Sequence, residues 1–170
     1  MTLFVLDDIL ANPDEYVQDV LKNPFVDVED GDNVFKGIQP RANDEVEKFV
    51  LLLFPDYTVK YNFIRQSPFK QIEPNYIHTD EMMGDKTVLV YLNKYYPPNA
   101  GTVLYDKDED KSVRIYMKYN RLVVFDSREK HSRNLYNNFG EKNNSRLVQV
   151  LFLKKWATSL NGKKMDWKEI

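Results

Sequence analysis

The sequence contains no cysteine among its 170 residues, and this absence excludes several kinds of site. Disulfides, thiolate metal sites, iron–sulfur clusters and cysteine nucleophiles all require a thiol. The absence also fits a reducing compartment. Histidine is nearly as scarce, because the chain has only two. A site built on imidazole must therefore use one or both of these histidines.

Long apolar runs are missing as well, and none approaches the roughly 20 residues that a membrane span requires. Residues 1–8 lack a basic segment followed by a long apolar one, so we expect no signal peptide and a soluble, cytoplasmic protein. The formal net charge of −2 gives no long-range attraction to nucleic acid or to an anionic membrane. We expect neither as a partner, and the sequence indicates no oligomeric state.

Aromatic residues are abundant, with 10 Phe, 11 Tyr and 2 Trp. They favour β structure with a well-filled interior. The length is typical of one domain, so we expect a single domain over residues 1–170. Two early helices are predicted, one capped by Asn12 and one near residues 43–54 capped by Asn43. Residues 25–42 between them have no clear period, and an irregular or partly stranded segment is expected.

From Tyr57 onward the apolar pattern changes to a period of two, which is typical of strands. Strands are predicted at residues 57–66, 86–93, 102–105, 113–118, 121–125 and 146–153. Early helices followed by many strands predict an α+β fold, mainly β, with the helices packed on an antiparallel sandwich or jelly roll.

The segment His78-Thr79-Asp80 contains the first candidate site residues. Residues i and i+2 of an extended chain point to the same side, so His78 and Asp80 can face one point. His131 directly follows a predicted strand and can supply a second imidazole. Two imidazoles and one carboxylate form the facial triad of non-haem Fe(II) oxygenases. The pattern His-x-Asp is weak by itself, and Asp80 could instead cap a turn.

Arg146 opens the strongly apolar strand that follows His131. A guanidinium at this place can lie beside a metal pocket and bind a carboxylate through two parallel hydrogen bonds. Arg133 competes for this role, but it lies only two residues after His131, in a predicted loop.

Several short motifs follow one another in an order that resembles a known family. They are His78-Thr79-Asp80, residues 87–93 (TVLVYLN), Gly101-Thr102, residues 122–127 (LVVFDS), His131-Ser132 and Arg146-Leu147-Val148. Over residues 57–154 the sequence resembles the Fe(II)/2-oxoglutarate-dependent dioxygenases, and its nearest branch is the prolyl-4-hydroxylase-like group with its phage and bacterial relatives. One departure is Ala100-Gly101, where this branch commonly has two glycines.

The resemblance implies a double-stranded β-helix, a distorted jelly roll with helices on one sheet and a core at about residues 57–154. It implies Fe(II) as the metal, with three ligands: His78, Asp80 and His131. It implies 2-oxoglutarate as cosubstrate, with Arg146 on the distal carboxylate. Further candidates for holding the cosubstrate are Tyr61, Tyr91 and Asn93. No catalytic residue beyond the metal ligands is implied.

The implied reaction uses O2 and 2-oxoglutarate to hydroxylate a C–H bond and releases succinate and CO2. The primary substrate stays open, and a peptide or amino acid is the favoured class. Two alternatives also stay open. A cupin-like metal enzyme could use the same ligands without 2-oxoglutarate and would have no need for Arg146. A non-catalytic β-sandwich protein with a structural or binding role, such as a virion component, could carry the triad by accident.

Overall fold

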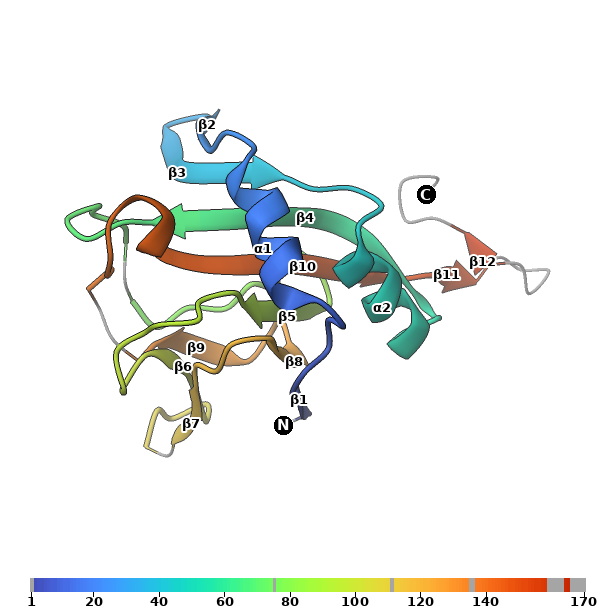
Figure 1. Ribbon diagram of the computed structural model, residues 1–170. Coiled ribbons are helices and arrows are strands. Elements are labelled where there is room, and N and C mark those ends of the chain that lie inside the picture. Colours follow the sequence, from blue (N-terminus) through green and yellow to red (C-terminus); the bar gives the residue numbers. More distant parts are fainter. Residues whose placement is uncertain (1, 75, 111, 135–136, 159–163, 166–170) are drawn as a thin grey trace.

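The computed structural model describes residues 2–74, 76–110, 112–134, 137–158 and 164–165. Their main part consists of two β-sheets in layers with helices on one side (Figure 1), and a short two-stranded sheet follows near the end of the chain. The large antiparallel sheet has the strand order β1-β8-β5-β10-β4-β3-β2 and the small sheet has the order β7-β6-β9. The large sheet consists of β1 (Leu3–Leu6), β2 (Val26–Asp30), β3 (Asn33–Pro40), β4 (Tyr57–Ser67), β5 (Lys86–Tyr91), β8 (Arg121–Asp126) and β10 (Arg146–Lys155). The small sheet consists of β6 (Gly101–Tyr105), β7 (Ser112–Tyr116) and β9 (Lys130–Arg133).

Two helices, α1 (Pro13–Leu21) and α2 (Glu45–Leu53), lie across one face of the large sheet (Figure 1). A 3-10 turn, η1 (Lys142–Asn144), precedes β10, and β11 (Ala157–Thr158) pairs with β12 (Lys164–Met165). No helix within the described residues combines the length and the apolar character needed to cross a membrane. The predicted fold class, α+β and mainly β with helices packed on one sheet of a jelly roll, is confirmed.

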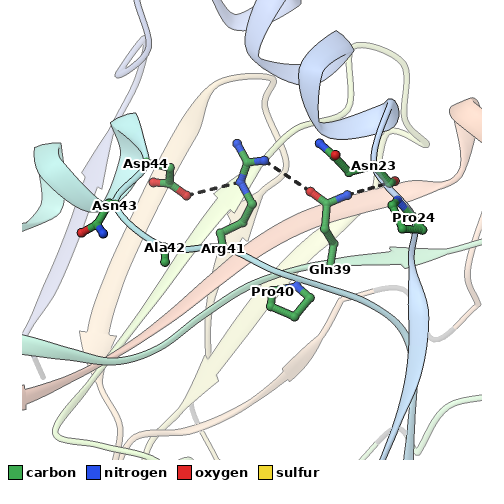
Figure 2. A pocket seen from close by; sticks show the side chains of 8 residues that line it. All are labelled: Asn23, Pro24, Gln39, Pro40, Arg41, Ala42, Asn43 and Asp44. Atoms are coloured by element: carbon green, nitrogen blue, oxygen red, sulfur yellow. Dashed lines mark hydrogen bonds and ion pairs between the residues drawn. The ribbon is translucent and has the colours of Figure 1, made fainter.

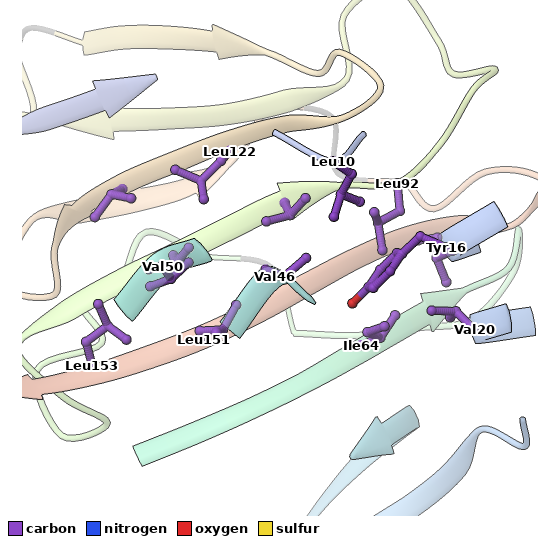
Figure 3. Close-up of a cluster of buried hydrophobic side chains, with 14 residues drawn as sticks. Leu10, Tyr16, Val20, Val46, Val50, Ile64, Leu92, Leu122, Leu151 and Leu153 are labelled. Atoms are coloured by element: carbon purple, nitrogen blue, oxygen red, sulfur yellow. The ribbon is translucent and has the colours of Figure 1, made fainter. Parts of the chain in front are cut away.

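Strand β10 lies between β5 and β4 at the centre of the large sheet, and its two faces contribute to two separate cores. Successive side chains on a strand point to opposite faces. Leu147, Leu151 and Leu153 therefore join the apolar cluster under the helices (Figure 3), whereas Val148 joins the cluster between the sheets. Arg146 lies on the same face as Val148, so its side chain is directed to the space between the two sheets, where the candidate site lies.

Residues 25–42 are partly stranded, in agreement with the expectation, and their two strands form the hairpin β2–β3 at one edge of the large sheet. Strand β3 obtains its backbone partners from β4, which is distant in sequence, and a local pattern does not reveal such pairing. The outer strand β2 is exposed along its whole length. The sheet thus extends beyond the core range of 57–154 that the resemblance implied.

The residue that caps α2 differs from the predicted one. Asn43 is not the cap, because it has a positive φ of 53° and precedes the true cap, Asp44. The Asp44 side chain accepts a hydrogen bond of 2.6 Å from the backbone N–H of Glu47, which satisfies one free donor of the first turn. Helix α1 begins after Asn12 as predicted, but the Asn12 side chain makes no capping hydrogen bond.

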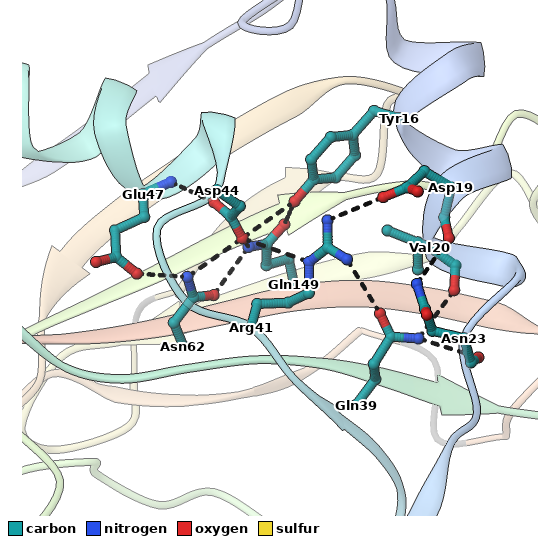
Figure 4. A network of polar contacts seen from close by, with 10 residues as sticks. All are labelled: Tyr16, Asp19, Val20, Asn23, Gln39, Arg41, Asp44, Glu47, Asn62 and Gln149. Atoms are coloured by element: carbon teal, nitrogen blue, oxygen red, sulfur yellow. Dashed lines mark hydrogen bonds and ion pairs between the residues drawn. The ribbon is translucent and has the colours of Figure 1, made fainter.

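A buried polar network joins both helices to the large sheet (Figure 4). Gln149 of β10 is fully buried and accepts a 2.6 Å hydrogen bond from the hydroxyl of Tyr16. Its amide nitrogen donates to Asp44 Oδ2 at 2.9 Å and to Asn62 Oδ1 at 2.8 Å. Arg41 adds an ion pair to Asp44 at 3.6 Å. Because every polar end of Gln149 has a partner, this network can be buried without a large desolvation cost.

A surface pocket of about 570 Å³ lies beside this network (Figure 2). It is lined by Asn23, Pro24, Gln39, Pro40, Arg41, Ala42, Asn43 and Asp44. Arg41 is held between Asp44 and Gln39, its guanidinium lying 3.4 Å from the Gln39 side-chain oxygen. None of the lining residues belongs to the predicted metal or cosubstrate site.

We expect Tyr16→Phe to lower the free energy of unfolding by about 1–3 kcal/mol, because it leaves the buried Gln149 oxygen without its donor. Chemical denaturation measures the change. Tyr95→Phe is the matched control, since Tyr95 is 78% exposed, and its effect should stay within about 0.5 kcal/mol. Equal effects of the two substitutions would contradict a stabilising role for the network.

Candidate metal centre

The two histidines of the chain are joined directly through their backbones. His131 lies in β9, and His78 lies in an extended segment before β5. The backbone N–H of His78 donates to the carbonyl of His131 at 3.0 Å, and the reverse hydrogen bond measures 2.9 Å. The N–H of Asp80 then donates to the carbonyl of Ser127 at 2.7 Å. These bonds attach the His78–Asp80 segment to the small sheet and to the end of β8.

The side chains of His78, Asp80 and His131 converge, and their candidate ligand atoms all lie within 4.8 Å of one another. Nε2 of His131 is 3.1 Å from Asp80 Oδ2, and Nε2 of His78 is 3.5 Å from Asp80 Oδ1. The His131 and Asp80 side chains are 9% and 13% exposed, whereas that of His78 is 39% exposed. The cluster is therefore partly open to solvent, on the side of His78.

Backbone carbonyls determine which imidazole nitrogen faces the centre. Nδ1 of His78 lies 2.9 Å from the carbonyl oxygen of Tyr76, and Nδ1 of His131 lies 3.0 Å from that of Glu129. A carbonyl oxygen can only accept, so each Nδ1 carries the hydrogen and donates it. Each Nε2 then faces the Asp80 carboxylate: it donates a hydrogen bond to Asp80 when the imidazole is protonated, and it presents a lone pair to a metal ion when the imidazole is neutral. The arrangement is typical of metal-binding histidines.

The charges of the cluster support this description. Burial raises the pKa of Asp80, but the hydrogen bonds with His131 and His78 outweigh it and hold the pKa below its usual value. The hydrogen bond with Asp80 raises the pKa of His78 despite the opposing effect of burial. Asp80 is therefore an anion at neutral pH and available as a ligand.

Thr87 of β5 orients the carboxylate from behind. Its hydroxyl donates to Asp80 Oδ2 at 3.0 Å and lies 3.0 Å from the hydroxyl of Ser127. Thr87 is only 1% exposed, so these bonds are shielded from water. Thr87 and Ser127 belong to the motifs that carry the family resemblance, but the sequence predicted no role for either, because neither belongs to the His-x-Asp pattern.

Arg146 begins β10 and faces the space between the two sheets. Within the described residues its guanidinium makes no hydrogen bond or ion pair. Burial, together with repulsion from Arg133, lowers the pKa of Arg146 to about 9, so the side chain remains a cation at neutral pH. A partly buried cation without a contacting counter-ion is costly for the protein alone and favours an anionic ligand.

Tyr91 is a near neighbour of Arg146, because it pairs with Val148 across β5 and β10. It is fully buried, and its hydroxyl lies 2.7 Å from the hydroxyl of Thr102 on β6. Asn93 is engaged with the backbone on both sides of Arg146. Its amide nitrogen donates to the carbonyl of Ser145 at 2.9 Å, and its oxygen accepts from the N–H of Leu147 at 2.7 Å.

Tyr61 lies on β4 and is 45% exposed. Tyr61 pairs with Phe152 of β10, and Phe152 pairs with Thr87 of β5. Tyr61 therefore lies on the same face of the large sheet as Thr87, which hydrogen-bonds Asp80. The cosubstrate roles suggested for Tyr61, Tyr91 and Asn93 stay predictions.

Arg133 is not in a loop as expected, since it belongs to β9 and pairs with Thr102. Its guanidinium is 2.9 Å from the carboxylate of Glu73 and donates to Asn138 at 2.7 Å. Arg133 therefore has a carboxylate partner within the chain, whereas Arg146 has none among the described residues. Sequence reasoning missed Glu73 because its partner Arg133 lies 60 positions away.

A second surface pocket, of about 350 Å³, borders the cluster. It is lined by Thr79, Tyr105, Lys107, Asp126, Arg128, Glu129 and Lys130. Thr79 lies between His78 and Asp80, and Lys130 precedes His131, so all three candidate ligands have a chain neighbour in this pocket.

No family model matches the chain, and no curated protein matches it either. Solved structures do match. A prolyl hydroxylase from Trichoplax adhaerens, in complex with a hypoxia inducible factor peptide fragment, aligns with a TM-score of 0.65 and 18% identity over 89% of this chain and 82% of its own. A viral collagen prolyl hydroxylase from Paramecium Bursaria Chlorella virus-1 aligns with a TM-score of 0.58 and 12% identity over 90% and 89%. A 2OG-Fe(II) oxygenase family member from Burkholderia pseudomallei aligns with a TM-score of 0.54 and 16% identity over 89% and 84%.

The chain has the fold of the Fe(II)/2-oxoglutarate oxygenases. The double-stranded β-helix that the sequence resemblance implied is therefore confirmed. In this oxygenase fold the small sheet supplies His131, and the strand that begins with Arg146 faces it from the large sheet.

We expect Mn(II), an air-stable substitute for Fe(II), to raise the melting temperature of the protein and to leave Asp80→Ala unaffected. A ligand at about 100 times its Kd stabilises by about 2.7 kcal/mol, which a thermal-shift assay detects readily. Asp108→Ala removes the same charge from an exposed turn and should respond as the wild type does. If Mn(II) shifted Asp80→Ala as strongly as Asp108→Ala, the three side chains would not be the ligands.

Thr87→Val should weaken Mn(II) binding by about tenfold, since a hydrogen bond that orients a ligand is lost while shape is kept. Mn(II) affinity can be measured by titration with electron paramagnetic resonance of the free ion. Thr58→Val makes the same change on β4 and should leave the affinity unchanged. An unaltered affinity in Thr87→Val would show that Asp80 needs no support from β5.

Proposed function

We propose that the protein is an Fe(II)- and 2-oxoglutarate-dependent dioxygenase that hydroxylates a C–H bond of its primary substrate. The observation that carries this proposal is the combination of two features between the same two sheets. His78, Asp80 and His131 converge with their lone pairs inward, and Arg146 lies between the same two sheets without a counter-ion among the described residues. The first feature suits a metal ion and the second an anionic cosubstrate.

The donor set fits Fe(II). Two imidazole nitrogens and one carboxylate oxygen, contributed from one side, are the ligands of non-haem Fe(II) oxygenases and leave positions open for other molecules. The Nδ1 hydrogen bonds to Tyr76 and Glu129 hold both rings in the tautomer that a metal ligand needs. Thr87 holds the carboxylate in place.

Arg146 fits the distal carboxylate of 2-oxoglutarate. A guanidinium binds a carboxylate through two parallel hydrogen bonds, and partial burial strengthens this interaction. Asn93 fixes the backbone on both sides of Arg146, so the side chain starts from a rigid point. Tyr91 and Val148 supply a buried wall next to it.

Bound Fe(II) with 2-oxoglutarate and O2 would supply the oxidising chemistry, in which 2-oxoglutarate becomes succinate and CO2, one oxygen atom enters succinate and the other enters the substrate C–H bond. The residues of this chain contribute binding and orientation. Arg146 holds the far end of the cosubstrate, Asp80 and the two histidines hold the metal, and the apolar cluster between the sheets excludes water.

A peptide or an amino acid is the favoured substrate class. Two solved structures with this fold are prolyl hydroxylases, one of them in complex with a peptide fragment. The 39% exposure of the His78 side chain and the adjoining pocket leave the cluster accessible to a substrate from solvent.

Arg146→Gln separates this proposal from a cupin-like metal enzyme that does not use 2-oxoglutarate. In the wild type, we expect 2-oxoglutarate to raise the melting temperature beyond the effect of Mn(II) alone. In Arg146→Gln the Mn(II) effect should remain, while the affinity for 2-oxoglutarate falls by about 100-fold, because a charge-assisted bidentate contact is lost. Isothermal titration in the presence of Mn(II) measures this affinity.

Arg128→Gln is the matched control, because the Arg128 side chain is 76% exposed and should leave 2-oxoglutarate binding unchanged. A wild type that responds to Mn(II) but not to 2-oxoglutarate would favour the cupin-like alternative. A wild type that responds to neither would favour a non-catalytic β-sandwich protein.

A further inference from the structure

Glu73 is a buried carboxylate that the proposed reaction does not use. It lies in the segment between β4 and His78, and its side chain is only 2% exposed. Oε1 forms an ion pair with Nε of Arg65 at 2.5 Å and accepts a hydrogen bond from Ser67 at 3.1 Å. Oε2 accepts from Arg133 at 2.9 Å and from Asn138 at 2.6 Å. Both carboxylate oxygens are thus fully engaged by the chain itself.

Three arginines from three different strands lie near Glu73. Arg65 belongs to β4, Arg133 to β9 and Arg146 to β10. Arg146 pairs with Ser67, is diagonal to Arg65, and lies within electrostatic range of Arg133 and Glu73. We call Arg65, Arg133 and Arg146 the arginine cluster. With Glu73 included, it carries three positive charges and one negative charge.

Glu73 is ionised, and it is shared unequally among the three arginines. Burial raises the pKa of Glu73, but the charges of Arg133 and Arg65 and the hydrogen bonds from Arg133 and Asn138 outweigh it and hold the pKa below its usual value. The carboxylate contacts Arg65 and Arg133 and makes no ion pair with Arg146. Two guanidiniums are therefore already paired with an internal anion, whereas that of Arg146 has no anionic partner in the part of the chain that the structure describes.

We propose that Glu73 determines which anions bind between the two sheets: it fills the anion site of Arg65 and Arg133 as a built-in carboxylate, so that, beyond the group held at the metal, only one carboxylate of a ligand can be bound, at Arg146. The identity of that ligand as 2-oxoglutarate rests on the function proposed above. An anion with a third charged group has no free guanidinium to bind, and its extra charge is repelled by Glu73.

The variant Glu73→Ala tests this proposal directly. This variant removes the internal anion and leaves space beside two uncompensated guanidiniums. Such a change is destabilising, because buried charges lose their partner. A carboxylate from solution can then replace the lost one. Acetate, which has the same carboxylate group as the Glu73 side chain, is the probe.

The first experiment measures melting temperature against acetate concentration at constant ionic strength, with chloride as the balancing salt and no added metal. We expect acetate to stabilise Glu73→Ala and to shift the wild type by less than about a third as much. Glu109→Ala is the matched control, since Glu109 is an exposed carboxylate paired with Lys130. It should respond as the wild type does. Equal acetate shifts in all three proteins would overturn the proposal.

The second experiment measures selectivity in the presence of Mn(II). Propane-1,2,3-tricarboxylate and glutarate are compared as competitors of 2-oxoglutarate. The affinity for the tricarboxylate relative to glutarate should rise about tenfold in Glu73→Ala, because a second charge-assisted contact becomes available. An unchanged ratio would overturn the proposal.

Glu73→Gln covers the case in which Glu73→Ala does not fold even in acetate. The amide keeps the size and one acceptor but removes the charge, so the same ratio should rise about threefold through the loss of repulsion alone. A ratio equal to that of the wild type would again contradict the proposal. The acetate experiment needs neither metal nor 2-oxoglutarate, so it can succeed where the proposed function fails, and a failure of each is recognised separately.

Discussion

The two backbone hydrogen bonds between His78 and His131 are the interaction on which the candidate site depends. They join a segment without regular structure to the small sheet, and so bring the first part of the triad to the second. Two neighbouring residues support this junction. Ser127 receives the N–H of Asp80, and Thr87 supports the Asp80 carboxylate from the large sheet. The triad is thus held by three backbone hydrogen bonds and one hydroxyl.

Strand β10 connects this site to the rest of the molecule, because its two faces serve different purposes. On the helix side Gln149 links both helices to the sheet through a fully paired polar network (Figure 4). On the other side Arg146 and Val148 face the space between the two sheets. A substitution on the helix side can therefore change the free energy of unfolding while the residues of the candidate site stay the same. A substitution on the other side can change the candidate site while the polar network stays the same.

Local patterns were enough to predict the parts of the site that lie close together in sequence. His78 and Asp80 are two positions apart, so an extended chain places both side chains on one side. Arg146 was a candidate because it is an arginine at the start of an apolar strand. Contacts between distant segments could not be read in this way. Glu73 meets Arg133 only because β9 pairs with β6, and the sequence of β9 itself is too short and polar to predict a strand. For residues 25–42 a partly stranded segment was predicted, but its place in the large sheet was not, since β4 supplies the partner of β3.

The exposed outer strand β2 has a consequence for self-association. A free strand edge can pair with a second copy of itself, and the apolar Val26 and Val28 would favour such pairing. Between and after them the chain carries Asp27, Glu29 and Asp30. Two copies meeting at this edge would bring like charges close together, which opposes the extension of the sheet from one molecule into the next. The acidic residues of β2 thereby oppose aggregation through the edge of the sheet.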